Sequence, residues 1–207
     1  MFITVEGVEG TGKSTLASSL VTHLEGLGRS VTATHEPGGT PVGDRLRAIF
    51  LDPALAMRPL TEAMIVNAAR AELVESVIRP ALAAGHMVIC DRYVDATYAY
   101  QGYGRRIAMP MLRQTCEMAT EGLEPNLTLL LDLDPSLGLA RRHGTKLDRI
   151  EAEDLDFHRR VRQGYLEIAS KQPRFRLIDA AQSAEAVLAI ALRYVDAVAP
   201  FYAGKRL

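Results

Sequence analysis

Residues 7 to 14 have the types and spacing needed to bind the phosphates of a nucleotide. They follow the G-x-x-x-x-G-K-[ST] pattern of a phosphate-binding loop, and they read Gly7-Val8-Glu9-Gly10-Thr11-Gly12-Lys13-Ser14. The glycines let the backbone turn tightly enough for successive N–H groups to point at phosphate oxygens. Lys13 can bridge the β- and γ-phosphates, and Ser14 can ligate Mg²⁺. The alternative, a glycine-rich turn with a chance lysine, is disfavoured by the segments on either side.

Those flanking segments have the patterns of a strand and a helix. The apolar run Phe2-Ile3-Thr4-Val5 precedes the loop, and residues 14 to 27 have apolar side chains at helical spacing after it. The loop therefore opens onto a helix N-terminus, whose dipole favours a bound anion. We expect ATP to be held by the loop and the residue after it, namely Gly7, Val8, Glu9, Gly10, Thr11, Gly12, Lys13, Ser14 and Thr15.

A second group of chemically active residues follows another strand-like run. The apolar run from His86 to Cys90 leads into Asp91-Arg92-Tyr93, and open α/β sheets bind ligands at the carboxyl ends of their strands. We expect Asp91 to be an outer-shell partner of Mg²⁺, with capping of the following turn as the alternative. The planar guanidinium of Arg92 can bind a second phosphate in bidentate fashion.

Further cations occur at three places from which they could reach a phosphate. Arg47 follows the turn Glu36-Pro37-Gly38-Gly39-Thr40, and Arg70 lies in an Ala-rich helical stretch whose small side chains would let another group approach. Residues 141 to 151 join two helical patterns and are rich in cations. If this stretch closes over the loop, its basic side chains can neutralise charge on a transferring phosphoryl group. The candidates are Arg141, Arg142, Lys146 and Arg149. For all of these cations the alternative is a solvated helical face.

Five short apolar runs predict the strands of a parallel sheet. They alternate with helix-patterned segments, and they span residues 2–5, 30–34, 86–90, 127–131 and 174–178. Gly28 and Gly85 lie where helices would end before the second and third strands. The stretch 61–84 predicts a long core helix that Pro80 kinks or restarts. The expected fold class is therefore α/β, with a five-stranded parallel sheet between layers of helices.

The composition argues against several classes of protein. The chain has 207 residues, of which 48% are hydrophobic, and a formal net charge of -1, so we expect one domain and no bulk attraction to nucleic acid. Cys90 and Cys116, the two cysteines, lack disulfide or metal-binding spacing, and no apolar run is long enough for a membrane span. We expect a cytoplasmic enzyme with no nucleic-acid or membrane partner. The histidines are expected to be structural or exposed, with His143 alone near the basic stretch.

Taken together, five motifs resemble those of bacterial thymidylate kinases, which are P-loop nucleoside monophosphate kinases. They occur in the same order through most of the chain, and they are Gly7 to Ser14, Glu36-Pro37-Gly38-Gly39-Thr40, Asp91-Arg92-Tyr93, Ala99-Tyr100-Gln101-Gly102-Tyr103-Gly104-Arg105 and Leu147-Asp148-Arg149-Ile150-Glu151. The resemblance implies a single three-layer P-loop kinase domain over residues 1–207 with a lid at residues 142–151. It also implies Mg²⁺-dependent transfer of the ATP γ-phosphoryl group to dTMP, for dTTP synthesis.

The same resemblance implies which residues bind the acceptor. They are Glu9, Glu36, Pro37, Arg47, Val66, Arg70, Arg92, Thr97, Tyr100 and Gln101. Within this set Glu9 would meet the sugar 3′-hydroxyl, while Arg47 and Arg92 would bind the monophosphate. Arg70 would reach the pyrimidine, and Tyr100 would fill the space that a ribose 2′-hydroxyl needs. The implied catalytic residues are Lys13, Asp91, Arg142 and Arg149, and the implied Mg²⁺ partners are Ser14 and Asp91.

Two positions depart from the pattern of the family. Val66 stands where the family usually has a phenylalanine that stacks on thymine, and Ala96 stands where it usually has serine. Stacking on an aromatic face is worth about 1–3 kcal/mol per base, which would be lost unless a neighbouring side chain fills the space. One alternative function is therefore a kinase for another nucleoside monophosphate, and a second is an ATP-dependent switch protein that transfers nothing. The resemblance also implies a homodimer, to which the helix over 61–84 could contribute unless it is a core helix.

Overall fold

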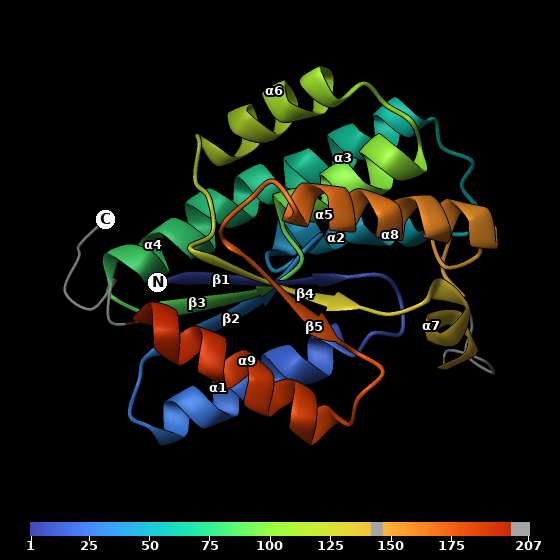
Figure 1. Ribbon diagram of the computed structural model, residues 1–207. Coiled ribbons are helices and arrows are strands. Elements are labelled where there is room, and N and C mark those ends of the chain that lie inside the picture. Colours follow the sequence, from blue (N-terminus) through green and yellow to red (C-terminus); the bar gives the residue numbers. More distant parts are fainter. Residues whose placement is uncertain (142–146, 200–207) are drawn as a thin grey trace.

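The five strands form one parallel sheet with the order β2-β3-β1-β4-β5. The computed structural model describes residues 1–141 and 147–199, and the four strand pairings within them are all parallel (Figure 1). The strands are β1 (Phe2–Gly7), β2 (Val31–His35), β3 (Met87–Asp91), β4 (Leu127–Asp132) and β5 (Phe175–Asp179). Each begins and ends within two residues of its predicted position, so the predicted α/β fold class is confirmed.

The central strands are buried on both faces. All six residues of β1 are buried, as are the first five of β4. Ile3 and Val5 pack into the hydrophobic cluster on one side of the sheet, whereas Phe2 packs into a cluster on the other side. Because both faces need apolar side chains, these strands have continuous apolar runs rather than an alternating pattern.

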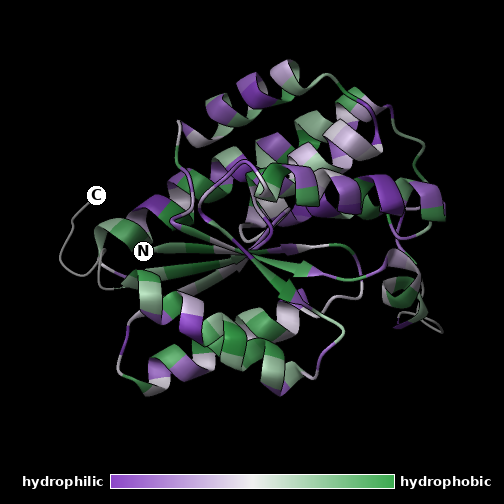
Figure 2. Cartoon of the chain, in the orientation of Figure 1, coloured by the Kyte–Doolittle hydropathy of each residue, from purple (hydrophilic) through white to green (hydrophobic). Residues whose placement is uncertain are grey.

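Two helices cover one face of the sheet, and the remaining helices lie mainly on the other. The helices α1 (Lys13–Gly26) and α9 (Ala184–Val198) lie below the sheet in Figure 1, where Leu16 and Leu20 of α1 pack with Ala191 of α9. Figure 2 shows that the strands are largely hydrophobic, whereas α8 mixes hydrophilic and hydrophobic residues. This mixture fits a helix that packs on one side and contacts solvent on the other.

The remaining helices form the second layer and include the elements that line the site. They are α2 (Pro41–Leu51), α3 (Pro59–Leu73), α4 (Arg79–Ala83), α5 (Val94–Thr97), α6 (Met109–Thr120), α7 (Pro135–Arg141) and α8 (Leu155–Ala169), with the π-helical segments η1 (Val74–Ile78) and η2 (Tyr98–Gly104). Within the described ranges, no helix combines the length and the apolar character that a bilayer crossing needs.

The long helix predicted over residues 61–84 is built from three consecutive segments. It runs as α3, then through the π-helical turn η1, and then as α4 with Pro80 in its first turn. Proline has no N–H to donate, and its ring crowds the carbonyl four residues earlier. The widened turn before Pro80 accommodates that conflict, as π-helical turns in helices commonly do.

A pair of glycines lets the phosphate loop pack directly on α7. Gly10 has φ +72°, and a Cβ atom on it would lie 2.0 Å from the carbonyl oxygen of Gly138. A Cβ atom on Gly138 would in turn lie 2.2 Å from the carbonyl oxygen of Glu9. This backbone contact places the loop beside the helix that leads into the predicted lid. The first half of that lid, residues 142–146, lies outside the described residues.

Candidate active site

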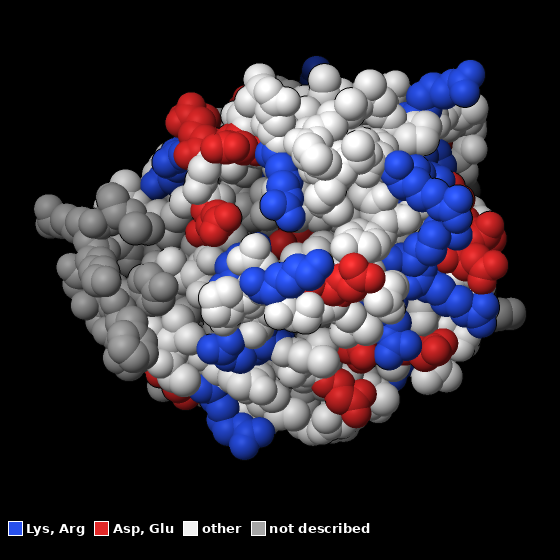
Figure 3. Space-filling model, turned by 45° about the horizontal axis from the view of Figure 1, so that its top comes forward, with Lys and Arg blue, Asp and Glu red and all other residues white. Residues whose placement is uncertain are grey.

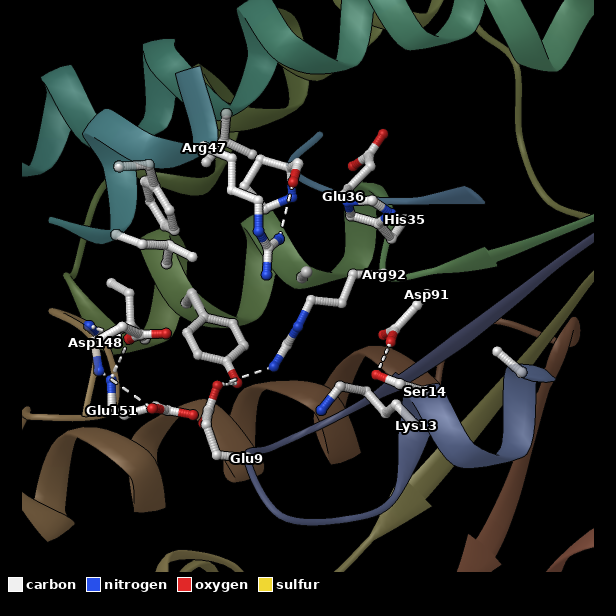
Figure 4. Close-up of a pocket in the computed structure, with 18 of the residues that line it drawn as sticks. Glu9, Lys13, Ser14, His35, Glu36, Arg47, Asp91, Arg92, Asp148 and Glu151 are labelled. Carbon is white, nitrogen blue, oxygen red and sulfur yellow. Dashed lines mark hydrogen bonds and ion pairs between the residues drawn. The ribbon is translucent and has the colours of Figure 1, made fainter. Parts of the chain in front are cut away.

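A pocket of about 770 Å³ opens at the carboxyl ends of β1, β2 and β3. This volume is within the range of sites that enclose small molecules. The pocket brings together all ten residues predicted to bind the acceptor with most of the phosphate loop (Figure 4). The predicted residues that line it are Glu9, Gly10, Gly12, Lys13, Ser14, Thr15, Glu36, Pro37, Arg47, Val66, Arg70, Asp91, Arg92, Thr97, Tyr100 and Gln101.

Lys13 is folded back onto the phosphate loop. Its side chain is buried, and Nζ donates a hydrogen bond of 2.8 Å to the carbonyl oxygen of Val8. Burial and the nearby Arg92 lower the pKa of Lys13 to about 8, although Glu9 and Asp91 favour its charge. A phosphate placed beside Nζ would stabilise the ammonium form, so the loop is suited to a strongly anionic ligand.

Ser14 and Asp91 form a hydroxyl–carboxylate pair at the mouth of the loop. The Ser14 hydroxyl donates to Asp91 Oδ2 at 2.5 Å, which joins the start of α1 to the end of β3 (Figure 4). Both groups supply the oxygen atoms that Mg²⁺ prefers. No group of three or more His, Cys, Asp or Glu side chains in the described residues could hold a metal ion. A metal at this pair would therefore complete its coordination with phosphate oxygens and water, as Mg²⁺ commonly does.

Two arginines point into the acceptor side of the pocket. Arg47 Nη1 donates to the carbonyl oxygen of Pro37 at 2.9 Å, and Arg92 Nη2 donates to Glu9 Oε1 at 2.9 Å. Burial and the charge of Arg92 lower the pKa of Arg47. Burial also opposes the charge of Arg92, but nearby Tyr100, Tyr165 and Glu9 raise its pKa. The two guanidinium groups face a common space (Figure 4), where an anion would relieve their repulsion.

Glu9 is the acidic centre of the pocket floor. Its Oε1 accepts hydrogen bonds from the Tyr100 hydroxyl at 2.5 Å and from Arg92, while Oε2 lies 3.2 Å from His158 Nδ1. Burial would raise the pKa of Glu9, but His158, Arg92, Lys13 and Tyr100 together hold it well below its usual range. Glu9 is therefore an ionised acceptor facing the pocket.

His158 has a position that the sequence did not indicate. A structural or exposed position is expected for each histidine, and His158 is fully buried, where it contacts the carboxylate of Glu9. Its ring also packs edge-to-face with Phe157. The spacing of histidines along the chain could not reveal this contact, because 149 positions separate Glu9 from His158. His143, the histidine singled out by its position in the basic stretch, lies outside the described residues.

Arg70 lines the pocket, and its guanidinium is fully buried in a network of protein contacts rather than solvated. Its Nη2 and Nε bond to Glu36 Oε2 at 2.7 and 2.9 Å, and the remaining donors reach Asn67, Cys116, Thr97 and the Tyr93 carbonyl oxygen. Burial opposes the charge of Arg70, but Glu36 raises the pKa of the guanidinium. The contacts of Arg70 are therefore set mainly by Glu36, on the loop after β2, and not by the small side chains beside Arg70 in the sequence.

An apolar wall lies beside these polar residues. Val66 and Ala96 line the pocket together with Phe50, Leu51 and Ile150. Phe50 is the aromatic ring that sequence reasoning missed, since nothing in the apolar pattern of α2 distinguishes it from other core residues. Near this wall Gln101 donates to Glu62 Oε1 at 2.7 Å, which fixes the orientation of its amide.

The cations of the predicted lid are found in different places. Arg141 lines the pocket, and its Nη1 donates to the carbonyl oxygens of Gly10 and Ala180 at 3.2 Å each. Arg149 does not line the pocket. Its guanidinium bonds to Glu62 at 2.7 Å and lies 5.1 Å from the centre of the Phe50 ring. The candidates Arg142 and Lys146 lie outside the described residues.

A smaller pocket of about 250 Å³ adjoins the other side of the phosphate loop. It shares Gly12, Thr15 and Arg141 with the large pocket, and its far wall is formed by the loop after β5 and the start of α9. Gln182 is the polar side chain of that wall. No sequence pattern indicates this wall, because a β-strand followed by a Ser-capped helix is common to many α/β connections.

Glu6 is a buried acid beneath the pocket, and sequence reasoning also missed it. It is fully buried in β1, where Oε1 accepts from the Tyr93 backbone N–H at 2.7 Å and Oε2 accepts from the Tyr165 hydroxyl at 2.8 Å. Burial and the nearby Asp95 raise the pKa of Glu6 to about 8. Glu6 therefore gains a proton more readily in the folded chain than in the unfolded chain.

Comparisons with known proteins agree on one family. The family model described as thymidylate kinase matches residues 5–190. A protein named thymidylate kinase from Deinococcus radiodurans is 53% identical over 183 residues, covering 87% of this chain and 88% of the relative. Those from Symbiobacterium thermophilum and Caldanaerobacter subterraneus subsp. tengcongensis are 45% and 42% identical. The alignments cover 97% and 100% of this chain and 94% and 98% of the relatives.

The raised pKa of Glu6 predicts a specific pH dependence of stability. A raised folded-state pKa favours folding most below the unfolded value of 4.5, and this contribution is lost as the pH rises toward about 8. As the pH rises from 4.5 to about 8, the free energy of unfolding should fall less in Glu6→Gln than in the wild type, and the two falls should differ by at least about 1 kcal/mol. Urea denaturation across this pH range measures the difference. The exposed Glu25→Gln serves as the control, and parallel curves for the wild type and Glu6→Gln would contradict the prediction.

Proposed function

Because the chain belongs to the thymidylate kinase family, we propose that it transfers the γ-phosphoryl group of ATP to dTMP, giving dTDP and ADP. It is a phosphotransferase of the nucleoside monophosphate kinase class. The observation that carries the proposal is one cavity that contains both a phosphate loop with Lys13 and a second cationic group with Arg47 and Arg92. One group suits the donor phosphates, and the other suits the acceptor phosphate. A switch protein has no need of the second group.

ATP would be bound on the side of the phosphate loop. The loop N–H groups, the α1 N-terminus and Lys13 favour its phosphates. The adenine would occupy the smaller pocket beside Gln182 and Arg141, which adjoins the loop. When bound, Mg²⁺ would neutralise charge on the phosphates, and the oxygens of Ser14 and Asp91 are the groups of this chain that fit it.

The acceptor phosphate would lie between Arg47 and Arg92. An acceptor oxygen of dTMP is already ionised, so transfer needs no general base. The protein must instead align two polyanions and offset their repulsion, which accounts for the cations on both sides of the pocket. Glu9 and Tyr100 would contact the sugar, because both lie on the pocket floor beside Arg92.

Phe50 would supply the aromatic surface that Val66 lacks. It lines the pocket with Val66, Ala96 and Ile150, and Arg149 lies over its ring. Thr97 and Gln101 would face the polar edge of the thymine, whereas Arg70, whose donors are engaged by the protein, would act mainly by holding Glu36 and Thr97.

The lid would cover residues 142–151 of a single kinase domain and exclude water from the transferring group. Arg142 and Arg149 are its proposed catalytic cations. Arg149 is bonded to Glu62, so it could reach a phosphoryl group only after releasing that contact. A cytoplasmic location is part of the proposal, because the free and buried Cys90 and Cys116 suit a reducing compartment.

A coupled assay of ADP release tests the function. With ATP and Mg²⁺, we expect dTMP to give a higher kcat/KM than dUMP, dCMP, dGMP or UMP. Lys13→Ala should lower turnover by about a hundredfold or more, because it removes a cation aimed at the transferring phosphate. The exposed Lys171→Ala is the charge-matched control. Full activity in Lys13→Ala would contradict the assigned site, and preference for another monophosphate would contradict the assigned substrate.

The role of Phe50 gives a second prediction. Phe50→Ala should raise the KM for dTMP by about 5- to 100-fold, in line with the loss of one stacking contact, while the KM for ATP stays unchanged. Adding Val66→Phe to this variant should recover part of the affinity. Ile49→Ala, an exposed neighbour on the same helix, is the control. An unchanged KM for dTMP in Phe50→Ala would show that the ring does not contact the base.

We also propose a homodimer formed through α3 and α6. These helices pack against each other and expose Leu60, Met64, Met111 and Met118, with relative exposures of 48%, 54%, 48% and 74%. Figure 3, which turns the top of the molecule forward, shows uncharged surface between groups of charged side chains. Contiguous exposed apolar side chains on a helical face are typical of an interface.

Sedimentation velocity tests this interface. We expect the wild type to sediment as a dimer and Met64→Glu as a monomer, since a buried unpaired charge at the centre of the contact is costly. Leu27→Glu, which replaces an exposed leucine at the end of α1, should leave the dimer intact. A dimeric Met64→Glu would place the interface elsewhere.

A further inference from the structure

Arg92 has a backbone conformation that side chains other than glycine rarely adopt. Its φ is 73°, in the left-handed region, and it immediately follows the last residue of β3. Two hydrogen bonds fix the chain at this point. The Arg92 N–H donates to the Val5 carbonyl oxygen at 3.0 Å, and the next N–H, of Tyr93, donates to Glu6 Oε1 at 2.7 Å. The unusual conformation is thus held from β1, and one of its two anchors is a side chain.

The second carboxylate oxygen of Glu6 is connected to the side chain of Arg92 by hydrogen bonds through the Tyr165 hydroxyl. Glu6 Oε2 accepts from the Tyr165 hydroxyl at 2.8 Å, and that hydroxyl accepts from Arg92 Nη1 at 3.3 Å. The opposite edge of the guanidinium bonds to Glu9 through Nη2. Glu6 therefore fixes the backbone beside Arg92 with one oxygen and supports its guanidinium, through Tyr165, with the other.

Neither Glu6 nor Tyr165 contacts the pocket. Their relative exposures are 0% and 1%, and neither side chain lines the cavity. Asp95, the acid whose charge raises the pKa of Glu6, is already matched by two bonds of 2.7 and 2.8 Å to Arg174. Among the described residues Glu6 has no ion pair of its own. A buried acid without a counter-ion is unfavourable for folding, so a role in orienting the site accounts for its presence better than stability does.

We propose that Glu6 and Tyr165 are positioning residues that hold Arg92 in the orientation needed to bind the acceptor phosphate. This inference rests on the proposed function, in which Arg92 binds the phosphate of dTMP. It adds two residues that touch neither substrate. Without Glu6 and Tyr165, Arg92 would keep its charge and its contact with Glu9. It would lose the hydrogen bond from Nη1 to Tyr165, and the backbone after it would lose the hydrogen bond to Glu6.

Steady-state kinetics of Tyr165→Phe test the proposal. The substitution removes one hydroxyl and keeps the buried ring. We expect the KM for dTMP to rise about five- to tenfold while the KM for ATP changes less than twofold, because the lost hydrogen bond, of ordinary strength, acts on the phosphate through Arg92. Tyr103→Phe is the matched control, because its hydroxyl bonds to Glu167 on the same helix, α8, outside the pocket. It should leave both KM values unchanged.

Glu6→Gln provides a second, independent variant. Above pH 8, where Glu6 is ionised, both of its oxygens accept hydrogen bonds, whereas the amide of Glu6→Gln accepts at one polar atom and can meet the Tyr165 hydroxyl only as a donor. We expect the same selective rise in the KM for dTMP. The double variant should be no worse than the worse single variant, because both substitutions interrupt one chain of contacts. Additive effects would contradict the shared pathway.

Two outcomes overturn the proposal. One is an unchanged KM for dTMP in Tyr165→Phe, and the other is an equal rise in both KM values with a lower melting temperature, which marks general destabilisation. Failure of the proposed function is distinguishable, since the wild type would then release no ADP in response to dTMP. The thermal shift by inorganic phosphate is therefore also measured. Arg92→Ala should lower the rise in melting temperature that phosphate causes in the wild type. Tyr165→Phe should lower the same rise by a smaller amount, and Tyr103→Phe should leave it unchanged.

Discussion

The ion pair between Arg92 and Glu9 joins the carboxyl end of β3 to the phosphate loop. Both side chains are largely withdrawn from water, with relative exposures of 18% and 9%. A buried charge is tolerated only when it is paired and hydrogen-bonded, so each partner restricts the other. Tyr100 from η2 and His158 from α8 complete the surroundings of Glu9. The phosphate loop, the end of β3, η2 and α8 are thereby held around one carboxylate.

The charges of the pocket are arranged for anions. Lys13 has a lowered pKa, and Arg47 is disfavoured by its neighbour Arg92, so added negative charge stabilises both. Arg92, in contrast, is held in its charged form by carboxylates and tyrosines. The pocket thus has one cation that is fully matched before ligand binding and two that gain from a phosphate. Such a site favours two polyanions while the Arg92–Glu9 ion pair is already formed.

The sequence predicts the elements and the local chemistry well, but not the contacts between distant residues. The strands, the phosphate loop and the Ser14–Asp91 pair follow from short patterns, because apolar runs, glycine spacing and strand ends are local features. The network around Arg70 depends on Glu36, 34 positions away, and His158 reaches Glu9 from the opposite end of the chain. Phe50 and Arg149 illustrate the same limit. Only the packing of α2 against Arg149, in the second half of the predicted lid, shows that Phe50 lines the pocket and that Arg149 does not.

In the proposed reaction, ADP forms rapidly only when phosphates are bound at both cationic groups of the cavity. The most direct measurement is the rate of ADP formation from ATP and Mg²⁺ in the absence and in the presence of saturating dTMP. Slow hydrolysis without acceptor and a rise of at least an order of magnitude with dTMP is the result predicted, because transfer requires an anion between Arg47 and Arg92. Equal rates with and without dTMP would contradict it, because the second cationic group would then have no part in the reaction.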